Sequence, residues 1–175
     1  MLKVVDGSKA TDNLWGERWS KLCANAMGNP VQAMSGLGST EIASSEVGRA
    51  ITIHLASESA RVGLALGYTI PKINGAAAEQ WAAADQRETW QALDEMLRPK
   101  SASGRNWKAS MAQDVAKGRP TEIDGMNGFV VDKGRAAGVP TPVSAAVVET
   151  VREIDRGQRK QAAENIGLTL KRAGV

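Results

Sequence analysis

The sequence predicts an all-α protein, and three observations lead to this fold class. Apolar residues recur three and four positions apart along most of the 175-residue chain, which is the period of one helix face. No segment sustains the alternation of apolar and polar residues that is typical of a half-buried strand. Phe and Tyr, which favour strands, total only two residues. At this length, and with 42% hydrophobic residues, the chain can bury a core of its own.

Six helices are expected, and their approximate ranges are 13–29, 46–66, 74–98, 106–117, 122–138 and 143 onward into the tail. Asp12 can cap the first helix. Pro30 should interrupt it just after Asn29, because proline lacks the N–H that a helix interior needs. The apolar side of this helix, which we expect to be buried, consists of Leu14, Trp15, Trp19, Leu22, Cys23, Ala26 and Met27.

The second and third helices are bounded by residues with known roles at helix ends. Ser44 or Ser45 caps the second helix, Gly67 ends it, and Pro71 prevents it from resuming. The third helix is rich in alanine. The residues expected on its buried side are Trp81, Trp90, Leu93 and Met96.

Loops rich in small residues and proline separate the last three helices. The loop at 99–104 and the break at 118–120 bound the fourth helix. Thr121 is expected to cap the fifth, and Asp124, three residues later, would complete a capping-box-like pair. A rigid turn at 140–142 precedes the sixth helix.

Composition excludes several classes of protein and of site. A single cysteine, Cys23, rules out an internal disulfide and fits a reducing cytoplasm. With one histidine, His54, the chain has too few ligands for a zinc site, so no metal is expected. No apolar run approaches the ~20 residues of a membrane span, and the N-terminus has no secretory apolar segment. We therefore expect a cytoplasmic protein that does not contact a membrane.

The net charge of +3 equals the surplus of the segment 152–175, which has six basic and three acidic residues. These charges are spaced along an amphipathic helix and no aromatic residue lies among them. A solvated helix face explains this pattern better than a nucleic-acid site does. A dinucleotide-binding unit is not expected either, because Gly36-Leu-Gly38 follows a helix and lacks the third glycine of the fingerprint.

The first candidate site lies between Trp19 and Asn29. Lys21, Asn25 and Asn29 are four residues apart, so a single helix would present them as a ladder opposite its apolar side. An ammonium group beside two amides can bind and protonate a carbonyl oxygen. A solvated helix edge is the alternative for this spacing taken alone.

The second candidate site lies farther along the chain and includes Ser110 and Glu122. Glu122 falls in the first turn of an expected helix, where the helix dipole favours its ionised form. An anionic Glu122 facing Lys21 would keep the lysine charged and oriented. Capping and packing account best for three neighbouring residues, Asp124, Asn127 and Gly128.

Together the two sites resemble the C-terminal domain of the ketopantoate reductase (2-dehydropantoate 2-reductase) family. The lysine–asparagine ladder comes first, and three motifs follow it: Ser-Met-x-x-Asp at 110–114, Gly-Arg-x-Thr-Glu-Ile-Asp-x-x-Asn-Gly at 118–128, and Gly-Val-Pro-x-Pro at 138–142. The resemblance covers roughly Asn13 to Arg152. Each motif is weak alone, and their order and spacing make the combination specific.

The resemblance implies a helical domain of the 6-phosphogluconate-dehydrogenase-like type, which closes over a separate Rossmann domain that binds NADP(H). By this resemblance Lys21 protonates the carbonyl oxygen as hydride arrives at the carbon. Asn25 and Asn29 contact the substrate, and Asn29 also contacts the cofactor. Ser110 binds the substrate carboxylate or hydroxyl, and Glu122 orients substrate and lysine.

Some features depart from the family pattern. Ser39 stands where some members have an asparagine, and the stretch 74–98 has no clear counterpart, so the substrate can differ from ketopantoate. We expect a lead-in at 1–12, a ketopantoate-reductase-like helical domain at 13–155 and a basic helical tail at 156–175.

The expected function is that of the substrate-binding and catalytic-lysine half of an NADPH-dependent 2-oxo acid reductase in pantothenate biosynthesis, inactive without its Rossmann half. The expected partners are a small 2-oxo acid, a Rossmann domain in cis or in trans, and a second copy of this chain. The alternative is a non-catalytic helical module for dimerisation or interaction, because the face that a missing domain leaves uncovered would be apolar.

Overall fold

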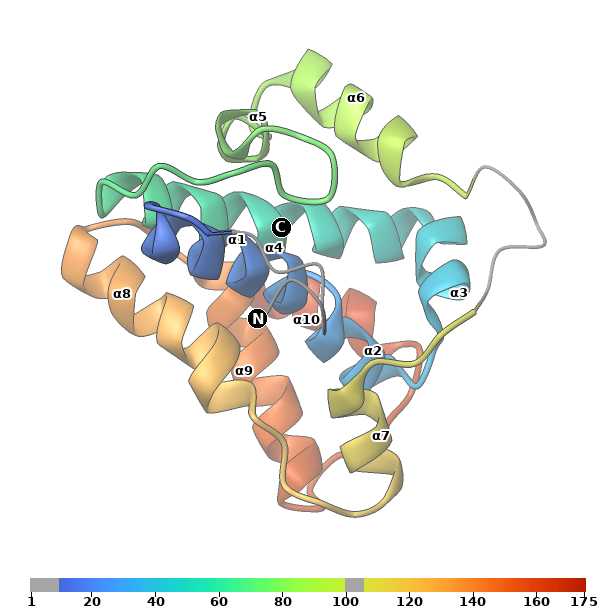
Figure 1. The fold of residues 1–175 in the computed structure, drawn as a ribbon. Helices are drawn as coiled ribbons and strands as arrows, with labels where there is room; N and C mark the ends of the chain where they lie inside the picture. The colour runs from blue at the N-terminus through green and yellow to red at the C-terminus, as the bar shows by residue number, and fades with distance from the viewer. Residues whose placement is uncertain (1–9, 100–105) are drawn as a thin grey trace.

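The structure, a computed structural model, describes residues 10–99 and 106–175 (Figure 1). Within these ranges it consists of helices and loops, with one isolated bridge between Ile73 and Ala76. The helices are α1 (Leu14–Ala26), α2 (Asn29–Ser35), α3 (Ser39–Ser44), α4 (Glu46–Ala65), α5 (Ala78–Ala82), α6 (Arg87–Leu97), α7 (Ser110–Ala116), the π-helix η2 (Asp124–Gly128), α8 (Phe129–Ala137), α9 (Pro142–Asp155) and α10 (Asn165–Ala173). The predicted all-α class is confirmed.

Helix α4 runs through the middle of the molecule, with α5 and α6 on one side and α1, α8 and α9 on the other (Figure 1). The sequence offered two serines as the cap of α4. Ser45 is the cap, because its hydroxyl accepts the Gly48 N–H at 3.3 Å. Ile51 and Leu55 in its middle are completely buried. Because helices cover α4 on several sides, its buried residues lie all around its axis.

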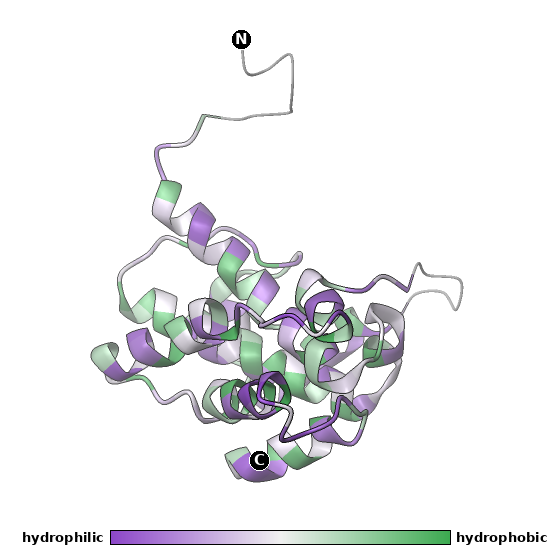
Figure 2. Cartoon of the chain, turned by 90° about the horizontal axis from the view of Figure 1, so that it is seen from below, coloured by the Kyte–Doolittle hydropathy of each residue, from purple (hydrophilic) through white to green (hydrophobic). Residues whose placement is uncertain are grey.

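Helix α1 packs closely on α4 through Trp19. The Trp19 indole donates to the Ser59 carbonyl at 2.9 Å, and a Cβ at Gly63 would lie 2.1 Å from the indole nitrogen, so only glycine permits this approach. The expected burial of Trp15 is wrong, since its side chain is 62% exposed. The buried stripe of α1 passes through Gly16 and Trp19, and Trp15 lies beside this stripe. Other helices also carry both hydrophobic and hydrophilic residues (Figure 2).

The expected continuous helix from residue 13 through Asn29 is also wrong, because α1 ends at Ala26 and Asn29 begins α2. Met27 and Gly28 form the turn between them. Pro30 occupies the second position of α2, where a backbone N–H would have no acceptor within the helix. The N–H that proline lacks is therefore not needed there. The proline therefore starts a buried helix instead of ending one.

The capping box expected at Thr121 and Asp124 does not form. The Thr121 hydroxyl donates to Asp155 at 2.7 Å, and Asp124 pairs with Arg152 at 2.8 Å. Both side chains thus bond to α9, which is distant in sequence. The helix that follows Thr121 begins as the π-helix η2. On η2 the buried Asn127 donates its side-chain amide to the Ala26 carbonyl at 3.1 Å and so fixes the end of α1.

Two other expected helices differ in extent. The stretch 74–98 contains two helices, because Asn74 and Gly75 form a turn with positive φ and a second turn separates α5 from α6. Trp81 and Leu93 are buried as expected, whereas Met96 is exposed. The helix expected from 106 begins only at Ser110. The expected loop at 99–104 lies almost entirely outside the described residues.

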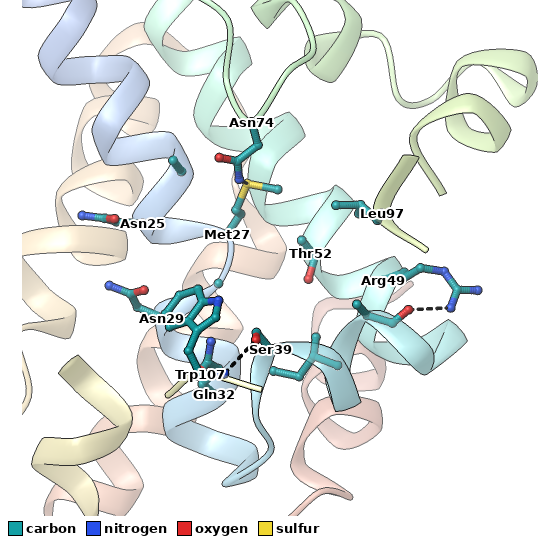
Figure 3. A pocket seen from close by; sticks show the side chains of 14 residues that line it. Asn25, Met27, Asn29, Gln32, Ser39, Arg49, Thr52, Asn74, Leu97 and Trp107 are labelled. Atoms are coloured by element: carbon teal, nitrogen blue, oxygen red, sulfur yellow. Dashed lines mark hydrogen bonds between the residues drawn. The ribbon is translucent and has the colours of Figure 1, made fainter. Parts of the chain in front are cut away.

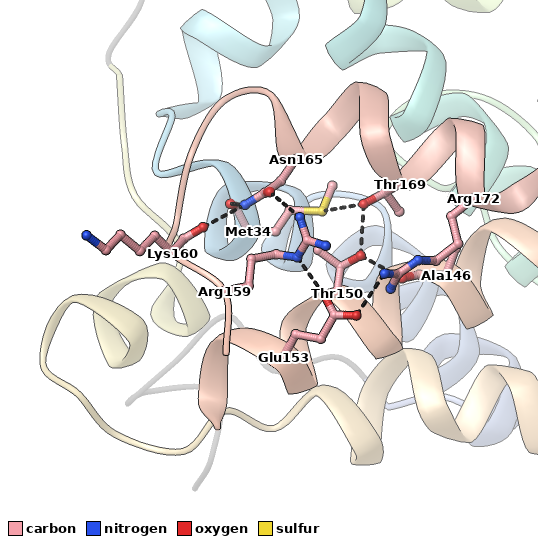
Figure 4. Close-up of polar contacts among 9 residues, drawn as sticks. All are labelled: Met34, Ala146, Thr150, Glu153, Arg159, Lys160, Asn165, Thr169 and Arg172. Atoms are coloured by element: carbon pink, nitrogen blue, oxygen red, sulfur yellow. Dashed lines mark hydrogen bonds and ion pairs between the residues drawn. The ribbon is translucent and has the colours of Figure 1, made fainter. Parts of the chain in front are cut away.

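The C-terminal helix α10 is amphipathic, as the sequence predicted, and its inner face packs on α9 and α2 (Figure 4). Thr169 shares a 3.0 Å hydrogen bond with Thr150 of α9. Asn165 donates to the Met34 carbonyl of α2 at 2.9 Å, which satisfies a carbonyl that the end of α2 leaves open. The segment after residue 155 is therefore part of the packed structure.

Two charged residues of this segment form ion pairs with α9 (Figure 4). Glu153 of α9 forms ion pairs with Arg159 at 2.5 Å and with Arg172 at 2.7 Å. Hydrogen bonds from Arg159 and then Arg172 outweigh the effect of burial and hold the pKa of Glu153 below its usual value. Two of the basic residues of the tail thus stabilise its attachment to α9.

Candidate functional site

A pocket of about 310 Å³ opens where α1 meets α2, opposite α3, α4 and the end of α6 (Figure 3). The chain that leads into α7 closes one side of it. The residues that line the pocket are Ala24, Asn25, Met27, Gly28, Asn29, Gln32, Ser39, Ile42, Ala43, Arg49, Thr52, Asn74, Leu97 and Trp107.

Two of the predicted site residues, Asn25 and Asn29, line this pocket together. Asn25 lies in the last turn of α1 and Asn29 is the first residue of α2. The turn at Met27 and Gly28 brings the two amides to the same side of the pocket (Figure 3), and Asn127 holds the α1 end of that turn. The amides are therefore neighbours through a helix–helix turn and not through the period of one helix.

The other predicted residues lie outside the lining of this pocket. Lys21 is exposed on α1, one turn before Asn25. Glu122 is exposed just before η2, and no ion pair joins it to Lys21 in this structure. Ser110 is exposed at the start of α7, three residues after Trp107, which does line the pocket.

Trp107 is held over the pocket by main-chain bonds to the start of α3. Its carbonyl accepts the Ser39 N–H at 3.1 Å, and its N–H donates to the Ser39 hydroxyl at 3.2 Å. Gln32 fixes the same segment, because its side-chain oxygen accepts the Ala109 N–H at 2.8 Å. The sequence singled out Ser39 as a departure from the family pattern. It gave no reason to single out Gln32, although Gln32 follows Asn29 by three residues on α2.

Arg49 is a buried residue of the pocket that the sequence did not indicate. Its Nε donates to Asp94 at 2.6 Å and its Nη1 donates to the Ala43 carbonyl at 2.9 Å. Asp94 of α6 also pairs with Arg98 at 2.9 Å. Burial raises the pKa of Asp94, but hydrogen bonds from Arg49 and Arg98 outweigh it and hold that pKa below its usual value. The positive charge of Arg49 is thus balanced within the protein.

The remaining candidates for chemistry have structural roles. Burial raises the pKa of the Cys23 thiol to about 12, so Cys23 is an unreactive core residue at neutral pH. His54 packs against Trp90 with ring centroids 4.9 Å apart, and burial, followed by the nearby Arg61, lowers the pKa of its imidazole. The described residues contain no group of three or more His, Cys, Asp or Glu side chains that could hold a metal ion. In the same part of the chain, no helix has both the length and the apolar character needed to cross a bilayer.

Comparison with known proteins shows the family of this chain. The family model described as "Ketopantoate reductase PanE/ApbA C terminal" matches residues 13–155. The chain is similar to the 2-dehydropantoate 2-reductase of Pyrobaculum aerophilum, with 33% identity over 135 residues that cover 77% of this chain and 42% of that protein.

Solved structures show the same relationship. The PanE/ApbA family ketopantoate reductase of Ralstonia eutropha JMP134 aligns with a TM-score of 0.65 and 26% identity over 86% of this chain and 44% of its own. A D-mandelate dehydrogenase, solved with NADH and anilino(oxo)acetate, shares the fold with a TM-score of 0.64 and 22% identity over 84% of this chain and 43% of its own. The chain thus spans less than half the length of each of these three proteins. It belongs to the ketopantoate reductase family, whose C-terminal domain its residues 13–155 match.

Proposed function

We propose that this chain is the substrate-binding and catalytic-lysine domain of an NADPH-dependent 2-oxo acid reductase, of the kind that converts 2-dehydropantoate to pantoate in pantothenate biosynthesis. The observation that carries the proposal is the pocket at the α1–α2 turn, where Asn25 and Asn29 meet from two helices. Family membership adds that relatives carry this activity in their names.

The amides of Asn25 and Asn29 suit a 2-oxo acid, because each has two N–H donors and one oxygen acceptor for the carboxylate and the carbonyl. Lys21 lies one turn before Asn25, and its long side chain would deliver a proton to the carbonyl oxygen at the rim of the pocket. Ser110, beyond Trp107, would donate to the substrate carboxylate or hydroxyl. Glu122 would accept from Lys21 and the substrate once the site is closed.

The described residues fit the cofactor only in part. They contain no strand followed by a glycine-rich turn and a helix, which is the unit that binds the pyrophosphate of a dinucleotide. Asn29, which lines the pocket, is the residue that would contact the nicotinamide end. When bound, the reduced cofactor supplies hydride to the carbonyl carbon of the substrate. We propose that a Rossmann domain, in cis or in trans, holds most of it.

Side-chain amide signals of the nitrogen-15-labelled chain test the proposal directly. Titration with 2-dehydropantoate should shift the Asn25 and Asn29 signals in a saturable way, because their amides would change hydrogen-bond partners. Asn165 is the internal control, since its buried amide is bonded to the Met34 and Lys160 carbonyls and does not line the pocket. The proposal fails if neither pocket amide responds to any 2-oxo acid, or if the Asn165 signal moves equally.

The second candidate function is that of a dimerisation module, and exposed apolar side chains favour it. Leu14, Trp15 and Phe129 are all exposed, on α1 and α8. Covering them with a second copy would remove apolar area from water. Sedimentation velocity over a range of concentrations tests this function, and a monomer at every concentration would contradict it. The two functions are compatible, because a dimer can still contain the pocket.

A further inference from the structure

The dipeptide Asn-Gly occurs twice in the sequence, as Asn74-Gly75 and as Asn127-Gly128. An asparagine in this position is open to chemical change, because the backbone nitrogen of the glycine can attack the side-chain amide carbon, and glycine has no Cβ to hinder the approach. Exposure and backbone freedom decide whether the attack takes place. The two dipeptides therefore present the same chemistry in two environments.

Asn74 and Gly75 form the tip of an exposed two-residue turn. Both have positive φ, 47° and 95°, and Asn-Gly favours a turn of this kind. The flanking residues hold its base, since the Ile73 N–H donates to the Ala76 carbonyl at 2.8 Å and the Ala76 N–H donates to the Ile73 carbonyl at 3.1 Å. Ile73 and Ala76 are buried. The tip can therefore change its backbone angles while its base stays anchored.

The two groups that would react lack strong partners at this turn. Among the described residues, none accepts a hydrogen bond from the Gly75 N–H, so this nitrogen can lose its proton to solvent. The side-chain amide of Asn74 donates to the Met27 sulfur at 3.3 Å. A thioether sulfur is a weak acceptor, so this contact restrains the amide little.

Asn127 and Gly128 lie in the opposite environment. Both belong to the π-helix η2, which runs directly into α8, and Gly128 has helical angles of φ −58° and ψ −42°. In a helix each N–H is directed along the axis toward an earlier carbonyl, and so away from the preceding side chain. Asn127 is completely buried and donates its side-chain amide to the Ala26 carbonyl at 3.1 Å. Reaction here would require η2 and its packing on α1 to open.

From this contrast we infer that Asn74 is a modification site, at which the chain deamidates spontaneously, and that the fold protects Asn127. The Gly75 nitrogen loses its proton and forms a bond to the side-chain carbon of Asn74. The bond from that carbon to the amide nitrogen breaks, and the nitrogen leaves as ammonia. Solvent water then opens the cyclic imide at either carbonyl and leaves aspartate or isoaspartate. Nothing is oxidised or reduced in these steps.

The modification would add a negative charge to the pocket, because Asn74 is one of its lining residues (Figure 3). Arg49 is the only ionisable side chain among the described residues that line the pocket, and it is already bonded to Asp94 at 2.6 Å. The new carboxylate would therefore oppose the binding of an acid. This consequence rests on the function proposed above, whereas the modification itself does not.

Peptide mass spectrometry of the folded chain after incubation in mildly alkaline buffer tests the inference. Lysine and arginine residues separate Asn74 from Asn127, so trypsin places them in different peptides. The peptide with Asn74 should gain the mass difference between a hydroxyl and an amino group. The same gain at Asn127 should be at least about 100-fold slower, because it requires opening of the core. In guanidinium chloride both should react at similar rates, which attributes the difference to the fold.

Two variants of the turn complete the test. Asn74→Gly removes the reactive amide and suits the positive φ, so it should fold and show no mass gain in its peptide. Asn74→Asp supplies the charged product in pure form. In the NMR titration of Asn25 and Asn29, 2-dehydropantoate should bind at least about threefold more weakly to Asn74→Asp than to Asn74→Gly.

The outcomes separate the modification from the proposed function. If the folded chain keeps Asn74 intact while the denatured chain loses it, the turn is protective and the inference is wrong. Equal reaction of Asn74 and Asn127 in the folded chain would overturn the protection by η2. If no variant binds an acid, the proposed function fails, and the mass gain at Asn74 still supports the modification. Equal binding by Asn74→Asp and Asn74→Gly would contradict the effect of the new charge on the pocket.

Discussion

Arg49 and Asp94 join two helices at the edge of the pocket, and their environment decides how much they stabilise the protein. The side chains are 7% and 17% exposed, so removal of either partner leaves the other charge in a poorly solvated place. By contrast, Asp132 and Arg135 form an ion pair whose side chains are both more than 70% exposed. Such surface pairs contribute little. Single residues therefore have to be judged by burial as well as by pairing.

Asp94→Asn should destabilise the protein by about 2–3 kcal/mol at neutral pH, because the buried Arg49 loses its counter-ion. The pKa of Asp94 is lower in the folded protein than in the unfolded chain, so its stabilising effect is present above the unfolded pKa and disappears as the pH falls through the folded pKa. The difference between wild type and variant should therefore shrink as the pH falls through the folded pKa, below the usual range of an aspartate. Urea unfolding at several pH values measures it. Asp132→Asn is the control, and an equal loss in both variants would contradict the explanation.

Lys21→Ala should leave the fold intact, because Lys21 is exposed and has no ion pair with any other described residue. In a reductase that combines this chain with a cofactor-binding domain, it should lower kcat by about 10²- to 10⁴-fold, the usual contribution of a general acid. The absorbance of NADPH at steady state measures this effect. Lys117→Ala, an exposed lysine after α7, is the matched control. Normal turnover of the Lys21 variant would refute the assigned role.

At the scale of elements, helix ends position the pocket. The end of α1 is held by Asn127 of η2, and the end of α2 is held by Asn165 of the C-terminal segment. These two asparagines come from segments far apart in sequence and satisfy carbonyls that helices leave open at their ends. Asn127 therefore fixes the end of α1 that leads into the turn presenting Asn25 and Asn29, and Asn165 fixes the far end of α2.

The central helix α4 allows a test of capping with adjacent serines. Ser45→Ala should destabilise the protein by about 1 kcal/mol, because the Gly48 N–H loses its acceptor at the start of α4. Ser44→Ala should cost less, since the Ser44 hydroxyl donates to the Thr40 carbonyl on the exposed end of α3. Thermal unfolding compares the two variants. A larger loss for Ser44 would mean that the cap is assigned to the wrong serine.

For the whole molecule, the packed helices enclose a pocket with amides on one side and an apolar wall on the other. The C-terminal segment belongs to this packing, since α10 lies on α9 and α2. What the described residues do not contain is a unit that binds a dinucleotide. In the function proposed above, the molecule would hold a small acid and present it to a cofactor held elsewhere.

We therefore expect no reductase activity from this 175-residue chain alone. Incubation with NADPH and 2-dehydropantoate should leave the NADPH absorbance unchanged, because the described residues contain no dinucleotide-binding unit. A full-length 2-dehydropantoate 2-reductase under the same conditions is the positive control. Oxidation of NADPH that depends on both this chain and the substrate would show that the chain binds the cofactor by itself.

The sequence by itself determined the helical class, the start and end of the central helix α4, and the family. Ser45, Gly67 and the apolar periodicity act within a few residues, and such local effects can be recognised from sequence alone. The sequence also pointed to Asn25 and Asn29, although it placed them on one helix. Local rules could not show whether Pro30 would end the first helix or begin the next, because both positions tolerate proline.

Tertiary structure alone decided the wall opposite the two asparagines. Arg49, Asn74 and Leu97 reach the pocket from separate helices and loops, and their meeting depends on how those elements pack. The same holds for Thr121 and Asp124, whose side chains bond to α9 instead of capping their own helix. Contacts between residues distant in sequence have no periodic signature, so the charge balance and the apolar character of the pocket emerge only when the helices are assembled.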